Sequence, residues 1–302
     1  MKEFKALVRR NVKLFFKDKG MLVSSLITPL ILLVLYATFL ANIYRDAFTS
    51  GLPEGLELPK KLIEGCVGGQ LASSLLSVCC VTVAFCSNLL MVQDKVNGSI
   101  YDLTIAPVKK STLALGYYVA SAFSTLLICL IAAGAAFIWI ACLGWYLSVL
   151  DVLCILLDIV LLVAFGTGLS SIIHHFLSTQ GQMSAVGTII SAGYGFICGA
   201  YMPISSFSSG LQKTLAFLPG TYGTSLFRNH YLRGVFQEMS DLGLPMEAIE
   251  GLRDSVDCNL YFFGNKVEIG VMYLVLGLSV VLLTGIYVLI HYVKRHEGKD
   301  KK

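Results

Sequence analysis

The residue types that carry chemistry in enzymes occur in this chain, but they do not stand in catalytic patterns. There is no G-x-x-x-x-G-K, H-E-x-x-H, G-x-S-x-G or Cys-x-x-Cys motif, and the single Gly-Lys pair, Gly298–Lys299, has no glycine at the required upstream position. The sequence therefore predicts no nucleotide site, no metal site and no catalytic residue. If the protein moves a substrate uphill, a partner or an ion gradient must supply the energy.

One acidic residue stands out by its surroundings. From residue 111 to residue 212 there is no Lys or Arg, and the only acids are Asp151 and Asp158. On a helix, Asp158 lies on about the same face as Asp151 and roughly 10 Å deeper in the membrane. Because a buried charge is costly, Asp158 is either neutral and hydrogen-bonded or a functional intramembrane acid, although no partner base stands in a neighbouring span.

Hydrolysis by His174 and His175, which end the same apolar stretch, is a further hypothesis.

The composition indicates a membrane protein. The 302 residues are 56% hydrophobic and 14% charged, with a mean hydropathy of +0.74 and a net charge of +4, whereas a soluble domain carries about 25% charged residues. These values exclude a soluble enzyme, a disordered chain and a nucleic-acid-binding protein. Six apolar stretches are long enough to span a bilayer as helices. They cover about residues 21–43, 67–92, 112–143, 149–173, 183–203 and 267–293.

The distribution of basic residues predicts the orientation. Six spans place both termini on one side of the membrane. The segments on that side carry 15 of the 23 Lys and Arg in the chain: seven in residues 1–20, three in the loop 94–111 and five in the C-terminal tail. Basic loops remain in the cytoplasm, so we expect a multi-pass protein of the cell membrane with both termini cytoplasmic. The long basic stretch and the long first apolar run argue against a cleaved signal peptide.

Residues 1–20 form a unit of their own in front of the six-span domain over 21–302. Apolar residues recur at three- and four-residue steps from Phe4 to Phe15, while the basic residues lie mainly on the other side. This pattern predicts an amphipathic helix at the cytoplasmic membrane interface. The helix is either a generic anchor or a contact for a cytoplasmic partner.

Two further segments carry Gly and Pro at informative positions. In the first cytoplasmic loop, Gly98 and Pro107 enclose a short run that predicts a helix ending before the proline. The second segment follows the fifth span and leads into amphipathic pieces around a proline. Its informative residues are Gly199, Pro203, Pro219, Tyr222 and Arg228.

Together these segments resemble the permease subunits of ABC type-2 exporters. In that family a Gly-Thr/Ser-…-Leu-…-Pro-Val stretch follows the second span, and a Gly-x-x-x-Pro, a Pro-x-x-Tyr and an Arg six residues after the Tyr come later. Residues 98–108 and 199–228 match these patterns, and the resemblance covers nearly the whole chain. One departure is that Tyr101 stands where the family often has a Glu, with Asp102 one position later.

The resemblance implies a permease dimer, formed with a second copy or a paralogue, bound to two cytoplasmic ABC ATPase subunits. Those subunits would hold the ATP and Mg, and this chain would bind no cofactor. The loop 94–111 would contain a coupling helix seated in an ATPase groove, so that ATP binding shifts the permease between inward- and outward-facing states. The residues expected at this contact are Gly98, Ser99, Tyr101, Asp102, Leu103, Thr104 and Pro107.

Two stripes of small or polar residues along the predicted spans are either packing contacts or parts of a translocation path or dimer interface. On the fifth span the stripe is Gly187, Ser191, Gly195 and Gly199, which favours a dimer-facing surface. On the second span it is Gln70, Ser74, Ser77 and Asn88, which favours a cavity wall.

Residues 204–266 form a large external segment. Its apolar part, 207–231, predicts a re-entrant hairpin, and its acidic part predicts a solvated cap. The acidic residues are Glu238, Asp241, Glu247, Glu250, Asp254 and Asp257. Cys66 and Cys258 lie near the predicted external face and are candidates for a disulfide in an oxidising compartment.

The sequence thus predicts an all-α polytopic membrane protein. It has six transmembrane helices, an amphipathic N-terminal interfacial helix, and a re-entrant external hairpin before the last span. The predicted function is export of an amphipathic cargo (a drug, peptide antibiotic, lipid or lipid-linked glycan), powered by a separate cytoplasmic ATPase. Membrane lipids are further expected partners of this chain. The alternative is a proton-coupled secondary carrier that uses Asp158.

Overall fold

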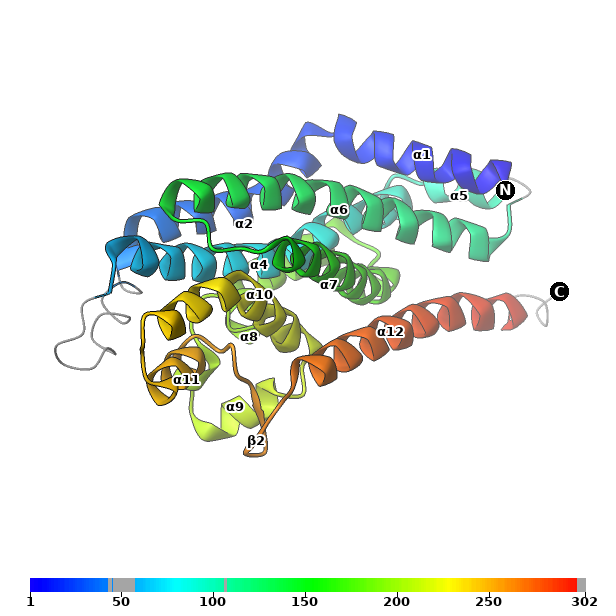
Figure 1. Cartoon of the computed structure of the whole chain (residues 1–302). Coiled ribbons are helices and arrows are strands. Elements are labelled where there is room, and N and C mark those ends of the chain that lie inside the picture. The colour runs from blue at the N-terminus through cyan, green and yellow to red at the C-terminus, as the bar shows by residue number, and fades with distance from the viewer. Residues whose placement is uncertain (43–44, 46–57, 106–107, 298–302) are drawn as a thin grey trace.

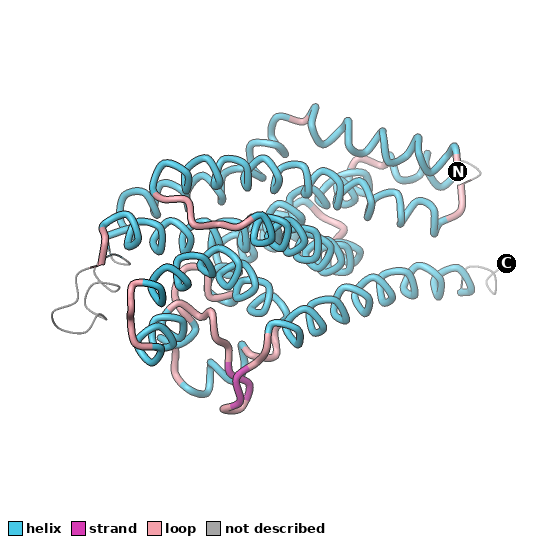
Figure 2. Tube along the Cα trace, in the orientation of Figure 1, coloured by secondary structure: helices cyan, strands magenta, loops and turns pink. Residues whose placement is uncertain are grey.

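The protein is a helical bundle. A computed structural model describes residues 1–42, 45, 58–105 and 108–297, and Figure 1 and Figure 2 show helices throughout this part, with one small hairpin of two strands. The hairpin pairs β1 (Tyr261–Phe262) with β2 (Asn265–Lys266). The prediction of an all-α polytopic membrane protein is confirmed.

The amphipathic segment at the N-terminus folds as α1 (Lys2–Lys17). Its buried residues, Leu7, Asn11 and Phe15, recur every fourth position, and this face packs on α6 (Lys110–Leu143). Asp18 leaves the helical conformation and then caps α2 (Lys19–Leu35), since its Oδ1 accepts hydrogen bonds from the amides of Gly20 and Met21. One residue therefore ends the first helix and starts the second, which continues as the π-helical turn η1 (Tyr36–Leu40).

The central element is α4 (Lys60–Val96), which is buried along most of its length. A helix that is apolar on all sides belongs in a core. Around it pack α2, α6, α7 (Val149–Phe176), α8 (Gln180–Ile197) and α10 (Pro219–Asp241). Gly69 permits the contact with α10, because a Cβ there would lie 2.7 Å from Cδ2 of Leu232 and 3.2 Å from the Tyr231 carbonyl oxygen.

The number of spans differs from the prediction. In the described part of the chain, five helical segments are long and apolar enough to cross a membrane. They are Lys19–Leu40, Lys60–Val96, Lys110–Leu143, Val149–Phe176 and Ile269–His291. The predicted span 183–203 corresponds to α8, which has 18 residues, begins with polar Gln180 and Gln182, and ends before Gly199 turns the chain with a φ of +76°. The six-span count is therefore not confirmed.

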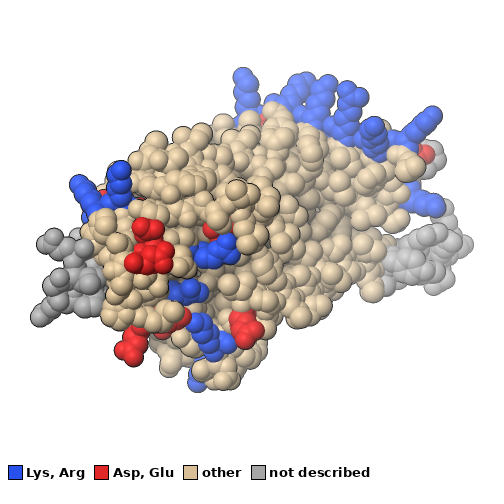
Figure 3. All heavy atoms as spheres, in the orientation of Figure 1, with Lys and Arg blue, Asp and Glu red and all other residues tan. Residues whose placement is uncertain are grey.

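The two ends of the bundle have different character. Figure 1 places the N-terminus, the C-terminal end of α12, α1 and α5 (Ser99–Ile105) at one end of the bundle. Figure 3 shows Lys and Arg gathered over α1, and we call this end the basic end. At the opposite cap end lie η2 (Ile204–Ser206), α9 (Ser209–Leu215), α11 (Met246–Ser255) and the β-hairpin. The last helix, α12 (Ile269–Glu297), runs from the cap end back to the basic end.

The segment between α8 and α12 departs from the simple hairpin expected of it. Residues 207–231 comprise α9, of which only Leu215 is buried, and the first half of α10, which packs along α4, α7 and α12. The expected re-entrant hairpin is thus one short surface helix and one long interior helix. The acidic cap also needs correction at one position, because Asp257 is buried and 3% exposed rather than solvated.

A glycine on α10 provides a test of this packing. A Cβ at Gly234 would lie 1.8 Å from the backbone oxygen of Tyr146, in the linker between α6 and α7. We expect Gly234→Ala to force backbone movement and to lower the free energy of unfolding by about 1–3 kcal/mol. Thermal unfolding in detergent measures the effect.

The matched control is Gly251→Ala on α11, where a Cβ meets nothing within 4 Å. This change should be neutral or stabilise the helix by up to about 1 kcal/mol. Equal unfolding midpoints for the two variants would show that the linker does not lie against α10.

Candidate functional site

The predicted coupling segment forms a short helix with two distinct faces. Gly98, with a φ of +79°, makes the turn from α4 into α5, and its carbonyl accepts from the Tyr101 amide over 2.9 Å. Ile100 and Leu103 pack against the hydrophobic cluster that includes Leu7 and Phe15 of α1. Ser99 begins the helix, and the Thr104 hydroxyl donates to the carbonyl of Tyr101. Pro107 lies outside the described residues.

The other face of α5 is exposed. Tyr101 is 69% exposed and Ile105 is 83% exposed, one helical turn apart, with Asp102 and Thr104 also exposed beside them. Tyr101 and Ile105 therefore form an exposed pair of large side chains at the basic end.

The last turn of α4 is bound tightly to the helices around it. Arg10 on α1 donates from both terminal nitrogens to Asp94, over 2.7 and 3.0 Å, and the Tyr117 hydroxyl on α6 donates to the same carboxylate. Hydrogen bonding to Asp94 raises the pKa of Arg10, which stays charged. Asp94 therefore joins α4 to α1 and α6, directly before the coupling helix.

Lys95, which follows Asp94, connects α4 to α7 in the same way. Nζ of Lys95 donates to the carbonyls of His174, His175 and Leu177 over 3.0, 2.7 and 3.0 Å. A lysine at the C-terminal end of a helix satisfies unpaired carbonyls and complements the helix dipole. His174 and His175, the candidates for hydrolysis in the sequence, thus supply backbone carbonyls that accept hydrogen bonds from Lys95.

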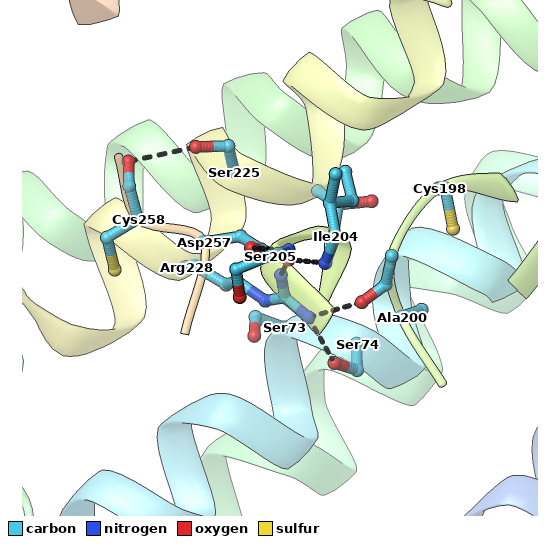
Figure 4. A network of polar contacts seen from close by, with 12 residues as sticks. Ser73, Ser74, Cys198, Ala200, Ile204, Ser205, Ser225, Arg228, Asp257 and Cys258 are labelled. Atoms are coloured by element: carbon cyan, nitrogen blue, oxygen red, sulfur yellow. Dashed lines mark hydrogen bonds and ion pairs between the residues drawn. The ribbon is translucent and has the colours of Figure 1, made fainter. Parts of the chain in front are cut away.

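We call the residues that match the second family pattern the signature residues: Gly199, Pro203, Pro219, Tyr222 and Arg228. At the cap end, Arg228 and Gly199 meet in one buried network, and Figure 4 shows Arg228 within it. Arg228 on α10 is fully buried, pairs with Asp257 over 2.8 Å, and donates to the Gly199 carbonyl over 2.6 Å. The same guanidinium lies 3.5 Å from the Ser74 hydroxyl on α4. Asp257 also accepts from the amide of Ile204, directly after Pro203, over 2.7 Å.

The remaining two signature residues shape the start of α10. Pro219 occupies the first position of the helix, where its missing N–H costs nothing. The Tyr222 hydroxyl donates to the Ala216 carbonyl at the end of α9 over 2.6 Å. The signature thus holds α8, α9 and α10 together, and Asp257 completes it from beyond α11.

Asp158 is not a lone acid, which corrects the sequence analysis. Nδ1 of His230 on α10 is hydrogen-bonded to Asp158 over 2.6 Å, and the Tyr273 hydroxyl on α12 donates to the other carboxyl oxygen over 2.7 Å. The sequence does not reveal this partner because His230 lies in the segment predicted to be an external hairpin. Asp151 pairs with Arg233 of the same helix α10 over 2.7 Å.

The polar stripe on the second predicted span lies in the protein interior. Gln70, Ser74, Ser77 and Asn88 are each at most 2% exposed. Ser77 donates to the carbonyl of Ser73 on its own helix, whereas the Asn88 amide donates to the hydroxyls of two serines on α7. The Asn88 contacts therefore join α4 to α7 within one chain, whereas the Ser77 bond stays within α4.

The stripe on α8 divides between a cavity and a packed contact. Gly187 and Ser191 line a groove of about 1280 Å³ between α2, α4 and α8. Its walls carry both apolar and polar side chains, from Asp18 near the basic end to Pro203 near the cap end. Gly195 lies under the ring of Tyr201, where a Cβ would be 2.2 Å from Cζ.

Cys66 and Cys258 are both buried and carry free thiols. Burial raises the pKa of the Cys258 thiol to about 12, so the reactive thiolate is scarce at neutral pH.

The comparison with protein families agrees with this geometry. The model of the ABC-2 type transporter family matches residues 2–232, from α1 to the signature arginine and just beyond it. The chain therefore belongs to the ABC-2 type transporter family and is a membrane permease of that family, whose members work with ABC ATPase partners. No curated protein matches the sequence.

The buried pair Arg228–Asp257 yields a direct test of the signature network. Removing one partner leaves an uncompensated buried charge, so we expect Arg228→Gln to lower the free energy of unfolding by about 3–5 kcal/mol. The double variant with Asp257→Asn should lose less than the sum of the two single variants. Unfolding in detergent measures all three.

Lys213→Gln on α9 serves as the control, since Lys213 is an exposed residue. We expect it to change stability by no more than about 0.5 kcal/mol. Additive effects of Arg228→Gln and Asp257→Asn would contradict the pairing.

Proposed function

We propose that this chain is the permease of an ATP-driven exporter and forms half of a dimeric pathway. A separate ABC ATPase docks on α5 and supplies the energy. The observation that carries the proposal is the exposed pair Tyr101 and Ile105, on a short helix whose other face is packed into the bundle. Such a helix presents apolar anchors to a partner and transmits force through its partly buried side.

The contacts at the end of α4 support this mode of coupling. A displacement of α5 acts on α4 directly through the turn at Gly98. Asp94 passes it to α1 and α6, and Lys95 passes it to α7. ATP binding then favours one arrangement of these helices over another by its differential binding energy, and the permease needs no catalytic residue.

The groove between α2, α4 and α8 suits the cargo path. It extends from Gln93 near the basic end to Ser206 near the cap end, and its open side faces away from this chain. A second permease packed against Gly187 and Ser191 closes it, since small residues allow helices to approach closely. A mixed apolar and polar lining favours an amphipathic cargo. The basic end faces the cytoplasm of the cell according to the positive-inside rule.

The carrier alternative rests on the triad Asp158, His230 and Tyr273. His230 and Tyr273 are each hydrogen-bonded to Asp158, and none of the three lines the groove, which favours a structural role. We therefore expect Asp158→Asn to retain ATP-dependent transport in proteoliposomes once its folding is verified. Transport that persists without an ATPase and fails in this variant would favour the carrier.

The proposed docking surface can be tested by truncation. We expect Tyr101→Ala with Ile105→Ala to weaken binding of the ABC ATPase partner about 30-fold, because an exposed aromatic anchor contributes about 2 kcal/mol to such an interface. Met246→Ala, at a residue 68% exposed on the cap end, is the control and should not change binding. Titration of the purified ATPase onto the detergent-solubilised permease measures the affinity.

The orientation is checked with the same two positions. Labelling by a membrane-impermeant maleimide is measured relative to the labelling of the parent protein. Tyr101→Cys should add label only in inverted vesicles, and Met246→Cys only in right-side-out vesicles. The reverse pattern would place α5 outside the cell and contradict the proposal.

A further inference from the structure

A second groove, of about 690 Å³, runs between α2, α4 and α6. Along α2 it extends from Leu22 to Tyr36, which is roughly 21 Å at 1.5 Å per residue. On α6 it extends from Leu127 to Trp139. Almost every side chain that lines it is apolar. In this it differs from the groove between α2, α4 and α8, which we call the cargo groove.

The groove has a buried floor and an exposed rim. Leu71 and Cys79 on α4, at 0% exposed, form the floor with Ile128, whereas Leu30 and Ile131 on the rim are 56% and 65% exposed. The far end is closed by Tyr36, whose hydroxyl donates to the Ala200 carbonyl. A long slot with these walls fits an extended hydrocarbon chain.

Positive charge lies at the other end of the slot. Phe16 and Leu22 line its beginning, on either side of the corner between α1 and α2. Within one helical turn of them stand three exposed lysines: Lys13, Lys17 and Lys19. Asp18 lies among them, but its carboxylate is engaged as the cap of α2. The cluster therefore carries a net positive charge at the level where a lipid headgroup would lie.

We propose that this groove binds an anionic glycerophospholipid. One acyl chain lies between α2 and α6, and the phosphate lies against Lys17 and Lys19. Charge complementarity selects the headgroup, since each basic side chain near an anionic lipid surface contributes about 1 kcal/mol. The bound lipid fills the space between α2 and α6 and fixes the corner to the membrane surface. The inference does not depend on the exporter function.

A second copy of the chain is the competing occupant. The groove lies on the opposite side of α2 from the cargo groove, which contains Ser191 and the other small residues of α8. Among the described residues, the lining of the groove offers few polar groups to orient a protein partner, whereas the adjacent lysines match a phosphate. The lipid is therefore the better fit.

Native mass spectrometry of the detergent-solubilised protein tests the proposal. Phosphatidylglycerol and phosphatidylcholine with identical acyl chains are added in separate titrations. We expect the parent protein to retain phosphatidylglycerol preferentially. Lys17→Gln with Lys19→Gln should reduce that preference about 30-fold, whereas Lys2→Gln with Lys5→Gln, at the far end of α1, should leave it unchanged.

A groove-filling variant tests the acyl-chain site. Ala132→Phe projects a ring into the groove and should abolish retention of both lipids, whereas Ala141→Phe, at an exposed residue of α6 outside the groove, should not. Equal retention of both lipids by the parent, or unchanged retention in Ala132→Phe, would overturn the proposal. So would loss of a dimer in Ala132→Phe, because that outcome assigns the groove to a second copy.

A photoreactive lipid keeps the test independent of variant folding. Phosphatidylglycerol with a diazirine near the end of its acyl chain is crosslinked to the unmodified protein, and the labelled peptides are identified. Labelling concentrated on residues 26–36 and 127–139 supports the groove. Labelling spread evenly over all membrane-facing helices contradicts it.

Discussion

Polar groups buried within a membrane protein must find partners inside the protein, and this constraint organises the structure. Arg228 illustrates it, since a fully buried guanidinium is tolerable only with a carboxylate and further acceptors. Asp257 and the carbonyl of Gly199 supply them from segments on either side of α10. The ion pair therefore fixes where the chain must return after α11, and with it the position of the whole cap end.

The same constraint makes each buried charge a connector between helices. Asp158 joins α7 to α10 and α12, Asp94 joins α4 to α1 and α6, and Lys95 joins α4 to α7. Apolar contacts alone allow helices to slide, because lipid tails and leucines are similar surroundings. The polar connections give specific positions to helices whose surfaces are otherwise alike.

The central helix α4 links the two ends of the molecule. Ser74 lies against Arg228 toward the cap end, and Asp94 and Lys95 form its last turn at the basic end. A helix buried on almost all sides moves only together with its neighbours. Its position makes it the natural path between α5 and the cap end. The two grooves lie on opposite sides of α2, one of mixed polarity and one almost wholly apolar, so the proposed cargo path and the proposed lipid site are separate.

The properties that depend on neighbouring residues could be predicted from the sequence. Long apolar runs predicted four helices and the last span closely, the periodicity of residues 2–17 predicted α1, and Gly98 predicted the turn before α5. The signature spacing from Gly199 to Arg228 identified the family before any contact was known. Local hydropathy failed at α10, because a helix shielded by protein need not be as apolar as a helix exposed to lipid. At α8 it predicted a span over 183–203, whereas the helix has 18 residues and ends at Ile197.

Only the tertiary structure decided which polar residues meet. His230 lies 72 positions from Asp158, and Asp94 lies 84 positions from Arg10, so no spacing in the sequence connects them. The sequence likewise placed Asp257 in a solvated cap because its neighbours are acidic, whereas folding buries it against Arg228. Hydropathy and periodicity are properties of a segment, but the partner of a buried charge is determined by the path of the whole chain.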